Sequence, residues 1–387
     1  MEKKRLLFVM NNMCMGGIQK ALISLLNELC TEFDITLLLF WKCGPLVDEI
    51  PSSVEVVETK SMFRLIGMSQ HGCTTFLEKT TRGALVILTR LLGRRAAIEL
   101  MKPSIRKDKL GDFDMVVSYS HCQASKMFYA GTAEYALYIK NANKRVCYIH
   151  CDYENSGTES RENNSIYRKF DYIVCVSQSV RKGFLRVLPD MKERTLAAEN
   201  PIRKSEIMAL AATNQFQYDT KTINMVSVAR ICQEKGIERV LKALGNLPTR
   251  NFKYYVVGDG DRRSASETLV KSLGLTDSVI FLGEDVNPYK YMINADFLVV
   301  PSYHEADPVV FQEAKMLGLP VFTTRTLSAD EMIGENYGWV VNNEDIAIER
   351  KLAELLEHKE VIDEKKQNMK AIDEKENSIT DFYNTLL

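Results

Sequence analysis

Short apolar runs alternate with amphipathic stretches along most of the chain. In the first half, apolar runs of four to six residues predict strands. The stretch 18–29 is apolar at helical spacing and predicts a helix after the first strand. The predicted strands are 6–10, 35–40, 54–57, 115–118, 146–149 and 172–176. This order of strands and helices is typical of a parallel sheet with helices on both faces.

A second alternating series begins near residue 223. Its predicted strands are 223–229, 254–257, 279–282, 297–300 and 321–323, and its main predicted helices are 236–244, 264–273 and 309–317. The pattern breaks between the two series at residues 188–204, where Pro189 and Pro201 flank a polar stretch, and we predict the inter-domain linker there.

The length agrees with two domains, because 387 residues exceed one ordinary core. We therefore predict an α/β protein with two Rossmann-like, doubly wound parallel-sheet domains that face each other across a cleft. The first would comprise residues 1–195 and the second residues 196–375.

Composition excludes several classes of protein. A net charge of −1 argues against a general nucleic-acid binder, and no apolar run approaches the roughly 20 residues that span a bilayer. The nine cysteines form no Cys-x-x-Cys pair, which is typical of a reduced, cytoplasmic protein. Cys147, His150 and Cys151 lie close in sequence, but no fourth ligand stands at a recognisable spacing, so we expect no metal site.

Two glutamates eight positions apart are the most specific chemical signal. Glu305 follows the predicted strand 297–300, and Glu313 lies in the predicted helix after Pro308. The first N–H groups of that helix, near Val309 and Val310, are free donors at the positive end of the helix dipole. This arrangement predicts a ligand site in which one carboxylate lies on the loop and the other on the helix. The phosphates of the ligand would lie at the start of the helix.

Two cations follow the predicted strand 223–229. Arg230 and Lys235 stand just past its carboxyl end, where open α/β sheets bind ligands. A guanidinium fork and an ammonium together suit a diphosphate. Taken alone, the same pair could be two solvated surface cations.

Three further signals are weaker by themselves. Gly258, in a strand-Gly-x-Gly turn, permits close approach of the backbone to a ligand, and Gly16 and Gly17 form a similar turn after the first strand. His150 ends the predicted strand 146–149. It could hydrogen-bond a sugar hydroxyl or be a satisfied core histidine.

The stretch 60–109 concentrates positive charge. It holds eleven lysine or arginine residues and three acidic ones, a net charge of +8, with apolar residues interleaved at helical spacing. A basic amphipathic helix of this kind is typical of an element that lies on a membrane surface. The alternative is an ordinary amphipathic helix with a solvated basic face.

Taken together, these residues resemble the retaining glycosyltransferases of family 4, which have the GT-B fold. The resemblance covers most of the chain and is most specific between residues 223 and 323. The segments that carry it in the second half are 227–230 with Lys235-Gly236, 258–260, 281–283 and Glu305 to Glu313. In the first half they are Gly16-Gly17 and 148–150, and Asn200 loosely matches an inter-domain element.

The resemblance implies a role for each matched residue. Arg230 and Lys235 would hold the donor diphosphate, Glu305 would contact hydroxyls of the donor sugar, and Glu313 would contact the nucleotide ribose. Other donor-binding positions would be Gly16, Gly17, Gly258, Leu282, Val309 and Val310, with His150 as an active-site histidine. Residues 376–387 would form a helix that crosses back to the first domain. The family often has glycine after the first glutamate; Ala306-Asp307 stands here, which leaves the donor sugar open.

The sequence thus predicts a retaining glycosyltransferase that moves a hexose or N-acetylhexosamine from a nucleotide sugar, with UDP as the expected nucleotide, without a cofactor or metal. The expected acceptor is a saccharide, lipid-linked, in capsule or exopolysaccharide synthesis. The expected location is cytoplasmic, with peripheral contact to the inner face of the plasma membrane. The alternatives are a GT-B sugar-nucleotide epimerase, a phosphorylase, and a non-catalytic partner subunit of the same fold.

Overall fold

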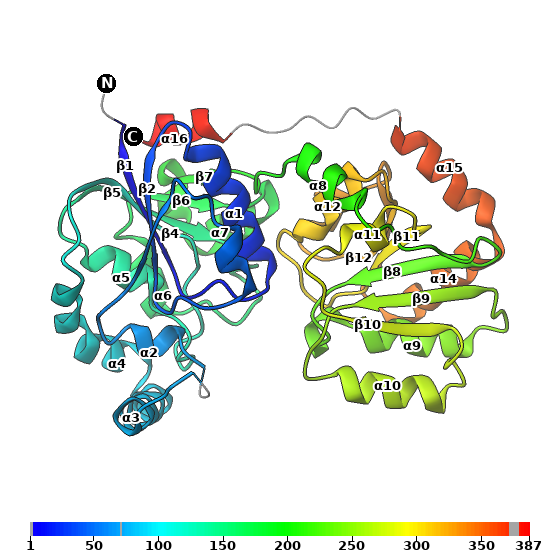
Figure 1. The fold of residues 1–387 in the computed structure, drawn as a ribbon, viewed down its shortest axis with the longest axis horizontal. Coiled ribbons are helices and arrows are strands. Elements are labelled where there is room, and N and C mark those ends of the chain that lie inside the picture. Colours follow the sequence, from blue (N-terminus) through cyan, green and yellow to red (C-terminus); the bar gives the residue numbers. More distant parts are fainter. Residues whose placement is uncertain (1–2, 70–71, 371–378) are drawn as a thin grey trace. The chain divides into compact units, whose positions relative to one another are not determined.

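The computed structural model describes residues 3–69, 72–370 and 379–387. The chain forms two compact units (Figure 1). The first domain comprises the chain up to Pro201 together with the C-terminal helix, and the second domain begins at Ile202.

The first domain is built on a parallel sheet of seven strands in the order β3-β2-β1-β4-β5-β6-β7. The strand order reverses between β1 and β4, and such a switch point is where ligands bind in open α/β sheets. The strands are β1 (Arg5–Met10), β2 (Asp34–Leu39), β3 (Glu55–Glu58), β4 (Phe113–Ser118), β5 (Ala142–Ile149), β6 (Tyr172–Cys175) and β7 (Thr195–Ala197).

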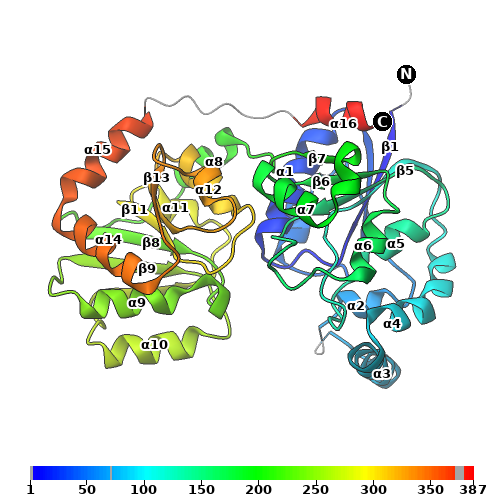
Figure 2. The ribbon, with the colours of Figure 1, turned by 180° about the vertical axis from the view of Figure 1, so that it is seen from behind.

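Helices cover both faces of this sheet (Figure 2). They are α1 (Gly17–Leu29), α2 (Arg64–Gly67), α3 (Phe76–Leu92), α4 (Arg94–Met101), α5 (Thr132–Tyr138), α6 (Arg161–Tyr167), α7 (Gln178–Val187) and α16 (Thr380–Leu386). Short 3-10 helices are η1 (Pro45–Glu49), η2 (Lys102–Asp108) and η3 (Pro189–Arg194). Ser177 is the N-cap of α7; its hydroxyl accepts a hydrogen bond from the Val180 N–H and so satisfies one free donor at the start of the helix.

The C-terminal helix α16 packs on the first domain. Tyr383 is fully buried, and its hydroxyl lies 2.9 Å from that of Tyr148 on β5. Its ring centroid is 6.1 Å from that of Phe8 on β1. At the start of the helix, the Glu28 carboxylate accepts a hydrogen bond from the Thr380 N–H. Residue 376, where the sequence predicts that this helix begins, lies outside the described residues.

The second domain is built on a parallel sheet of six strands in the order β10-β9-β8-β11-β12-β13. Its order reverses between β8 and β11. The strands are β8 (Ile223–Val228), β9 (Phe252–Val257), β10 (Val279–Gly283), β11 (Phe297–Val300), β12 (Val321–Thr324) and β13 (Gly338–Val341). Because the strands are buried on both faces, they read as continuous apolar runs rather than alternating ones.

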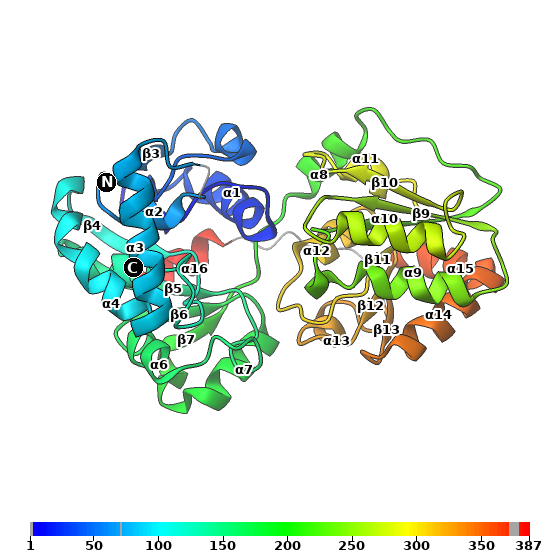
Figure 3. The same cartoon turned by 90° about the horizontal axis from the view of Figure 1, so that it is seen from below.

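Two apolar cores lie on opposite faces of this sheet. Successive residues of β11 divide between them, Phe297 facing one and Leu298 the other. Figure 3 shows helices on both sides of the strands. The helices of the second domain are α8 (Lys204–Ala211), α9 (Ile237–Asn246), α10 (Arg263–Ser272), α11 (Tyr289–Met292), α12 (Val309–Met316), α13 (Ala329–Met332), α14 (Asp345–Glu357) and α15 (Lys359–Lys370), with the 3-10 helix η4 (Gln233–Lys235).

The main departure from the sequence prediction is at residues 188–204. The predicted linker contains η3 and the strand β7, which pairs with β6 through Ile173 and Thr195. The prediction of a linker is therefore wrong for Thr195–Ala197. A strand of three residues between two prolines is too short to show a periodic pattern in the sequence. Its extended conformation is stabilised by the hydrogen bonds to β6.

Candidate functional site

The candidate site lies at the switch point of the second sheet. Strands β8 and β11 are hydrogen-bonded neighbours, with Phe297 opposite Met225. Since the strands are parallel, their carboxyl ends meet at one edge, and the loops that follow them lie side by side. The sequence predicted chemistry on both loops, and the sheet topology brings the two together.

A short ion pair joins these loops. Lys235 Nζ lies 2.6 Å from Glu305 Oε1, and the Ser302 hydroxyl donates to the same oxygen at 2.7 Å. The Glu305 side chain is only 10% exposed, so water screens this charge little. The contact fixes the carboxylate of the β11 loop against the ammonium of the β8 loop.

Arg230, on the same loop as Lys235, is placed differently. Its side chain is 70% exposed, and its Nη2 is 3.9 Å from Glu234 Oε2, an exposed pair of little energetic weight. The structure therefore brings Lys235 and Glu305 together and leaves the Arg230 guanidinium in solvent, within reach of an incoming anion.

The glycine after β9 is required by its neighbour, the loop after β8. Gly258 has φ 143°, and an added Cβ would overlap the carbonyl oxygen of Ala229. Its N–H donates to the Gly283 carbonyl at 2.7 Å. The sequence predicted close approach of a ligand at this turn; the close approach that the structure shows is that of the neighbouring loop, next to Arg230.

Helix α12 presents its first turn at the same edge. Pro308 stands at its N-cap, and in the described part of the chain no side chain caps this end. Val309 and Val310 are the first two helical residues and are half-buried. Amide N–H groups at the start of a helix lack intrahelical partners and favour an anion.

Glu313 lies farther along α12 and is buried, with 5% of its surface exposed. Tyr289 on α11 donates its hydroxyl to Glu313 Oε1 at 2.7 Å. One carboxylate oxygen thus has a protein donor, which holds the side chain in one orientation. Leu282, predicted to flank a nucleobase, is half-buried in β10 near the bridge between Gly258 and Gly283.

Sequence reasoning missed the residue that braces the β11 loop. Arg239 on α9 is 4% exposed and donates to the Pro301 carbonyl at 3.1 Å. It also binds Asp345 Oδ1 at 2.6 Å, and its guanidinium lies 4.3 Å from the Tyr303 ring centroid. The sequence gives no sign of this role, because the partners are about 60 and 100 positions away in sequence. The other missed residues are Ser302 and Tyr289, for which the sequence gives no signal.

In the first domain, His150 follows β5 and lies among aromatic rings. Its ring centroid is 4.8 Å from that of Tyr119 and 5.7 Å from that of Tyr148. Nε2 is buried and has no hydrogen-bond partner among the residues that the structure describes. Among the described residues that atom therefore lacks the partner that a satisfied core histidine would have.

Burial also sets the charge of this histidine. Removal from water, reinforced by the charge of His121, lowers the pKa of His150 to about 3. The imidazole is consequently neutral at physiological pH, so it can donate from one nitrogen and accept at the other.

Gly16 and Gly17 lie where α1 begins, after the loop that follows β1. Gly16 is the N-cap of α1 with an extended backbone (φ 176°), and Gly17 is the first helical residue. An added Cβ at Gly16 would meet only the end of the flexible Gln19 side chain, at 2.6 Å from Oε1. The fold itself therefore makes a weaker demand for glycine here than at Gly258.

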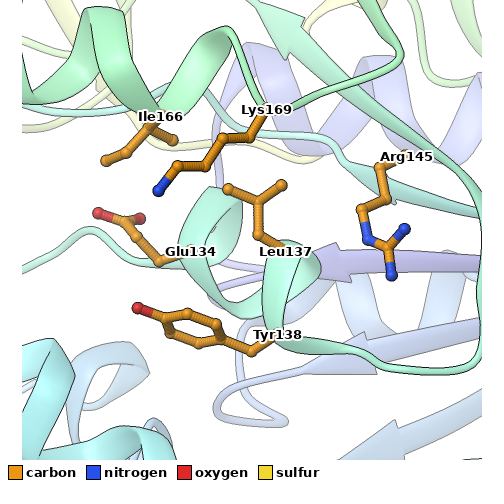
Figure 4. A pocket seen from close by; sticks show the side chains of 6 residues that line it. All are labelled: Glu134, Leu137, Tyr138, Arg145, Ile166 and Lys169. Carbon is orange, nitrogen blue, oxygen red and sulfur yellow. The ribbon is translucent and has the colours of Figure 1, made fainter.

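A hollow of about 320 Å³ lies elsewhere in the first domain (Figure 4). Its lining residues come from α5, β5, α6 and the turn after α6: Glu134, Leu137, Tyr138, Arg145, Ile166 and Lys169. Arg145 lies in the first half of β5, away from the carboxyl end where His150 stands. The hollow is therefore separate from the predicted site residues.

Cys147, His150 and Cys151 are residues of metal-ligating type that lie close together in sequence. Over residues 3–69, 72–370 and 379–387, no group of three or more His, Cys, Asp or Glu side chains is placed to hold a metal ion. All nine cysteines are free thiols.

The second domain matches a known family. The sequence model described as "Glycosyl transferases group 1" matches residues 211–375, which include Lys235, Glu305 and Glu313. The match thus covers the segment that carries the paired loops and the start of α12.

Two curated relatives illustrate the likeness. The lipopolysaccharide glucosyltransferase WaaG of Escherichia coli is 35% identical over 111 residues, 28% of this chain and 29% of WaaG. The N-acetylgalactosamine-N,N'-diacetylbacillosaminyl-diphospho-undecaprenol 4-alpha-N-acetylgalactosaminyltransferase of Campylobacter jejuni is 31% identical over 113 residues, 29% of this chain and 31% of the relative. The chain spans between 25% and 40% of the length of the curated relatives it matches.

Solved structures match over the whole chain. HepE from Anabaena in complex with UDP superposes with a TM-score of 0.67 at 18% identity, covering 99% of both chains. The WaaG structure gives 0.68 at 17% identity, covering 98% of both. The predicted GT-B architecture of two Rossmann-like domains is therefore confirmed, and the family match and the named relatives support the predicted glycosyltransferase class.

Proposed function

We propose that the protein is a retaining glycosyltransferase that moves a hexose or N-acetylhexosamine from a UDP-sugar to a saccharide acceptor. The observation that carries the proposal is the contact between Lys235 and Glu305 at the switch point of the second sheet, beside the start of α12. It puts an ammonium, a carboxylate and free amide donors within one edge of a sheet. Retention of configuration and the UDP donor rest on the family resemblance.

The chemistry requires stabilisation of a leaving diphosphate. As the bond from the anomeric carbon to the diphosphate breaks, negative charge grows on the phosphate oxygens and positive charge on the sugar ring. Lys235, the exposed Arg230 and the first N–H groups of α12 would stabilise the leaving group. These are fixed charges and dipoles already in the fold, so we propose that the reaction needs no cofactor and no metal ion.

The carboxylates and the histidine would orient the donor. In this proposal Glu305 accepts hydrogen bonds from sugar hydroxyls, and Glu313 binds the ribose through the carboxylate oxygen that Tyr289 leaves open. His150, neutral and with Nε2 unpaired in the described part of the chain, would bind a hydroxyl of the transferred sugar. Binding the sugar at several points fixes the anomeric carbon for attack.

The acceptor is proposed to be a lipid-linked saccharide of capsule or exopolysaccharide synthesis. The names of WaaG and of the Campylobacter enzyme refer to lipopolysaccharide and to a diphospho-undecaprenol-linked sugar. The +8 net charge of residues 60–109 supports peripheral contact with an anionic membrane. None of the helices that the structure describes has the length and hydropathy of a membrane span.

The diphosphate assignment is tested by removing the two cations. Arg230→Ala and Lys235→Ala should each lower turnover about 10²- to 10³-fold, as loss of a group that stabilises the transition state does. Release of UDP from UDP-sugars would be measured with EDTA in every assay. Lys242→Ala, an exposed lysine on the neighbouring helix α9, is the matched control and should keep normal turnover.

Near-normal turnover in both variants would contradict the assignment. A thermal-shift screen of nucleotide sugars gives an independent reading, because a ligand that binds only the folded state raises the melting temperature. UDP release that needs no acceptor would favour the epimerase, and binding without UDP release over a broad acceptor panel would favour a non-catalytic partner subunit.

A further inference from the structure

Helix α3 in the first domain has its apolar side turned to solvent. Five large apolar side chains on this helix are more than half exposed: Phe76 (84%), Leu77 (74%), Ile87 (59%), Leu91 (75%) and Leu92 (70%). Its buried residues are Arg82, Leu85 and Thr89. Figures 1 and 2 show α3 on the outside of the domain, beyond α2 and α4. This is the reverse of an ordinary amphipathic helix, whose apolar side faces the core.

Polar contacts hold α3 in this orientation. The buried Arg82 donates to the Met68 carbonyl at 3.2 Å and to the Tyr129 hydroxyl at 2.7 Å, and its guanidinium lies 5.4 Å from the Phe128 ring centroid. Rotating the helix to bury its leucines would expose these groups and break their hydrogen bonds. A buried arginine left without partners is costly, so the contacts fix the outward direction of the apolar side.

The start of α3 is fixed as well. Thr75 and Glu78 form a capping box, and Arg64 Nη1 lies 2.6 Å from Glu78 Oε1. Both contacts involve the one acidic residue of the helix, and its charge is thereby paired.

The exposed side is mostly apolar, although the exposed Thr80 lies between Leu77 and Ala84. Leu77, Ala84 and Leu91 recur every seven residues and form one row along the helix, with Ile87 beside them. Over 17 residues the helix is about 25 Å long. A row of this length is larger than the scattered exposed leucines found on ordinary soluble surfaces, and such rows mark binding surfaces.

Cations border the row and dominate its surroundings. Lys79 and Arg90 are exposed, stand about three turns apart and lie along one border of the row. The helices that follow, α4 and η2, add further exposed cations: Arg95, Lys102, Arg106 and Lys107. The acidic residues nearby are engaged, since Glu99 lies 3.8 Å from Lys102 and Asp108 accepts from the Lys60 N–H and the Tyr135 hydroxyl.

We infer that the apolar row of α3 inserts into the interfacial layer of an anionic lipid bilayer, with the bordering cations on the lipid phosphates. An apolar side that enters the acyl boundary and a basic border that meets negative headgroups are the two features of interfacial helices. The inference specifies the element that makes the membrane contact of the proposed function. It does not depend on the donor chemistry.

The charge pattern favours lipid over a second copy of the chain. In a two-fold symmetric dimer the same surface faces itself, so the rows of Leu77 and Leu91 would bring Lys79 and Arg90 of both copies together. Like charges at short range oppose that pairing, whereas an anionic surface attracts them.

Vesicle sedimentation at low salt tests the inference. The native protein should bind vesicles of phosphatidylglycerol and phosphatidylcholine, and the Leu77→Glu, Leu91→Glu double variant should bind at least about tenfold more weakly. Both residues are exposed, so folding should be unaffected. The matched control is Met208→Glu with Ile346→Glu, which replaces two exposed apolar residues of the second domain and should bind as the native protein does.

A second variant separates charge from insertion. Lys79→Gln with Arg90→Gln should weaken vesicle binding about fivefold to tenfold at low salt. The affinity of this variant should also change less with salt concentration than that of the native protein. Pure phosphatidylcholine vesicles should bind the native protein weakly.

Three outcomes would overturn the inference. They are equal binding by the leucine variant and the native protein, native protein that does not bind the anionic vesicles, and a native dimer that the leucine variant converts to monomer without any change in vesicle binding. The last would assign the row to a second copy. Each is read without a sugar nucleotide, so loss of the membrane contact is distinguishable from failure of the proposed reaction.

Discussion

The two sheets share the order of their first six strands but differ in the chemistry at their carboxyl edges. At the switch point of the second sheet, charged groups predominate, with Lys235 held against Glu305 and Arg230 exposed beside them. The edge of the first sheet carries His150 beside the rings of Tyr119 and Tyr148. At this edge burial keeps the imidazole of His150 itself neutral.

This difference suggests a division of tasks. Fixed charges suit a diphosphate, whose own charge changes as it departs. Neutral rings and an imidazole suit hydroxyl groups, which need directional hydrogen bonds and no net charge. If the comparison is right, substitutions at the carboxyl edge of the second sheet should weaken binding or turnover of the nucleotide sugar. Substitutions at the edge of the first sheet should leave nucleotide binding unchanged.

The largest effect is expected at the backbone packing that supports the charged edge. Gly258→Ala should destabilise the second domain by about 3 kcal/mol or more, because its Cβ overlaps the Ala229 carbonyl and its φ of 143° is strained for alanine. Denaturation would be followed by Trp339 fluorescence in a Trp41→Phe background. Gly83→Ala, in the middle of α3 with open space around it, should instead stabilise the first domain by about 0.5–1 kcal/mol, read from Trp41 fluorescence in the chain that keeps this tryptophan. Equal stability of the Gly258 variant and the parent would show that the loops can separate.

A smaller effect is expected from removing one charge of the ion pair. Glu305→Gln should lower kcat/KM for the UDP-sugar about 100-fold, since a site built to accept hydrogen bonds from sugar hydroxyls loses its anionic acceptor. The affinity for UDP alone should stay the same or rise, because Lys235 is then free for the diphosphate. Glu354→Gln on α14 is a control for charge. If UDP affinity fell in parallel with kcat/KM, Glu305 would be acting on the nucleotide and not on the sugar.

The smallest effect concerns the pH dependence of stability that comes from His150. Since the pKa of His150 is near 3 when folded and 6.5 when unfolded, the unfolded chain binds the extra proton between these values. Stability is therefore lost as pH falls below 6.5, by roughly 1.4 kcal/mol per pH unit from this group. His150→Gln should reduce that slope, measured by denaturation between about pH 4 and pH 6 with Trp41 as probe.

Its neighbour must be considered in that measurement. His121 contributes with the opposite sign, because the nearby Cys151 raises its pKa against the effect of burial, and it is present in both proteins. An unchanged slope in the His150→Gln protein would mean that His150 is hydrated and titrates normally.

Much of the fold and the charged edge could be predicted, because both depend on local pattern. The buried parallel strands read as apolar runs, and Glu305, Lys235 and Arg230 each follow such a run directly. The sequence does not show which strands are neighbours. In the structure β8 pairs with β11, and Lys235 Nζ and Glu305 Oε1, from residues 70 positions apart, lie 2.6 Å from each other. Strand β13 escaped notice because Gly338–Val341 is a run of four with no periodic context.

The orientation of α3 was beyond sequence reasoning for a different reason. Its pattern has an apolar side and a basic side, and the usual expectation is that the apolar side is buried. Arg82 reverses this, but its partners Tyr129 and Met68 become visible only in three dimensions. Arg239 is a similar case, a helical cation whose role depends on distant carbonyl and carboxylate groups.

The contact between Tyr148 and Tyr383 also bears on how the protein is made. The two hydroxyls are 2.9 Å apart, yet their residues are separated by 235 positions. The strand that carries the first tyrosine leaves the ribosome long before the helix that carries the second, and the whole second domain is synthesised in between. Part of the surface of the first domain therefore stays exposed to solvent until α16 has been synthesised and docks on it. Chains that lack this last helix should aggregate most readily at this stage.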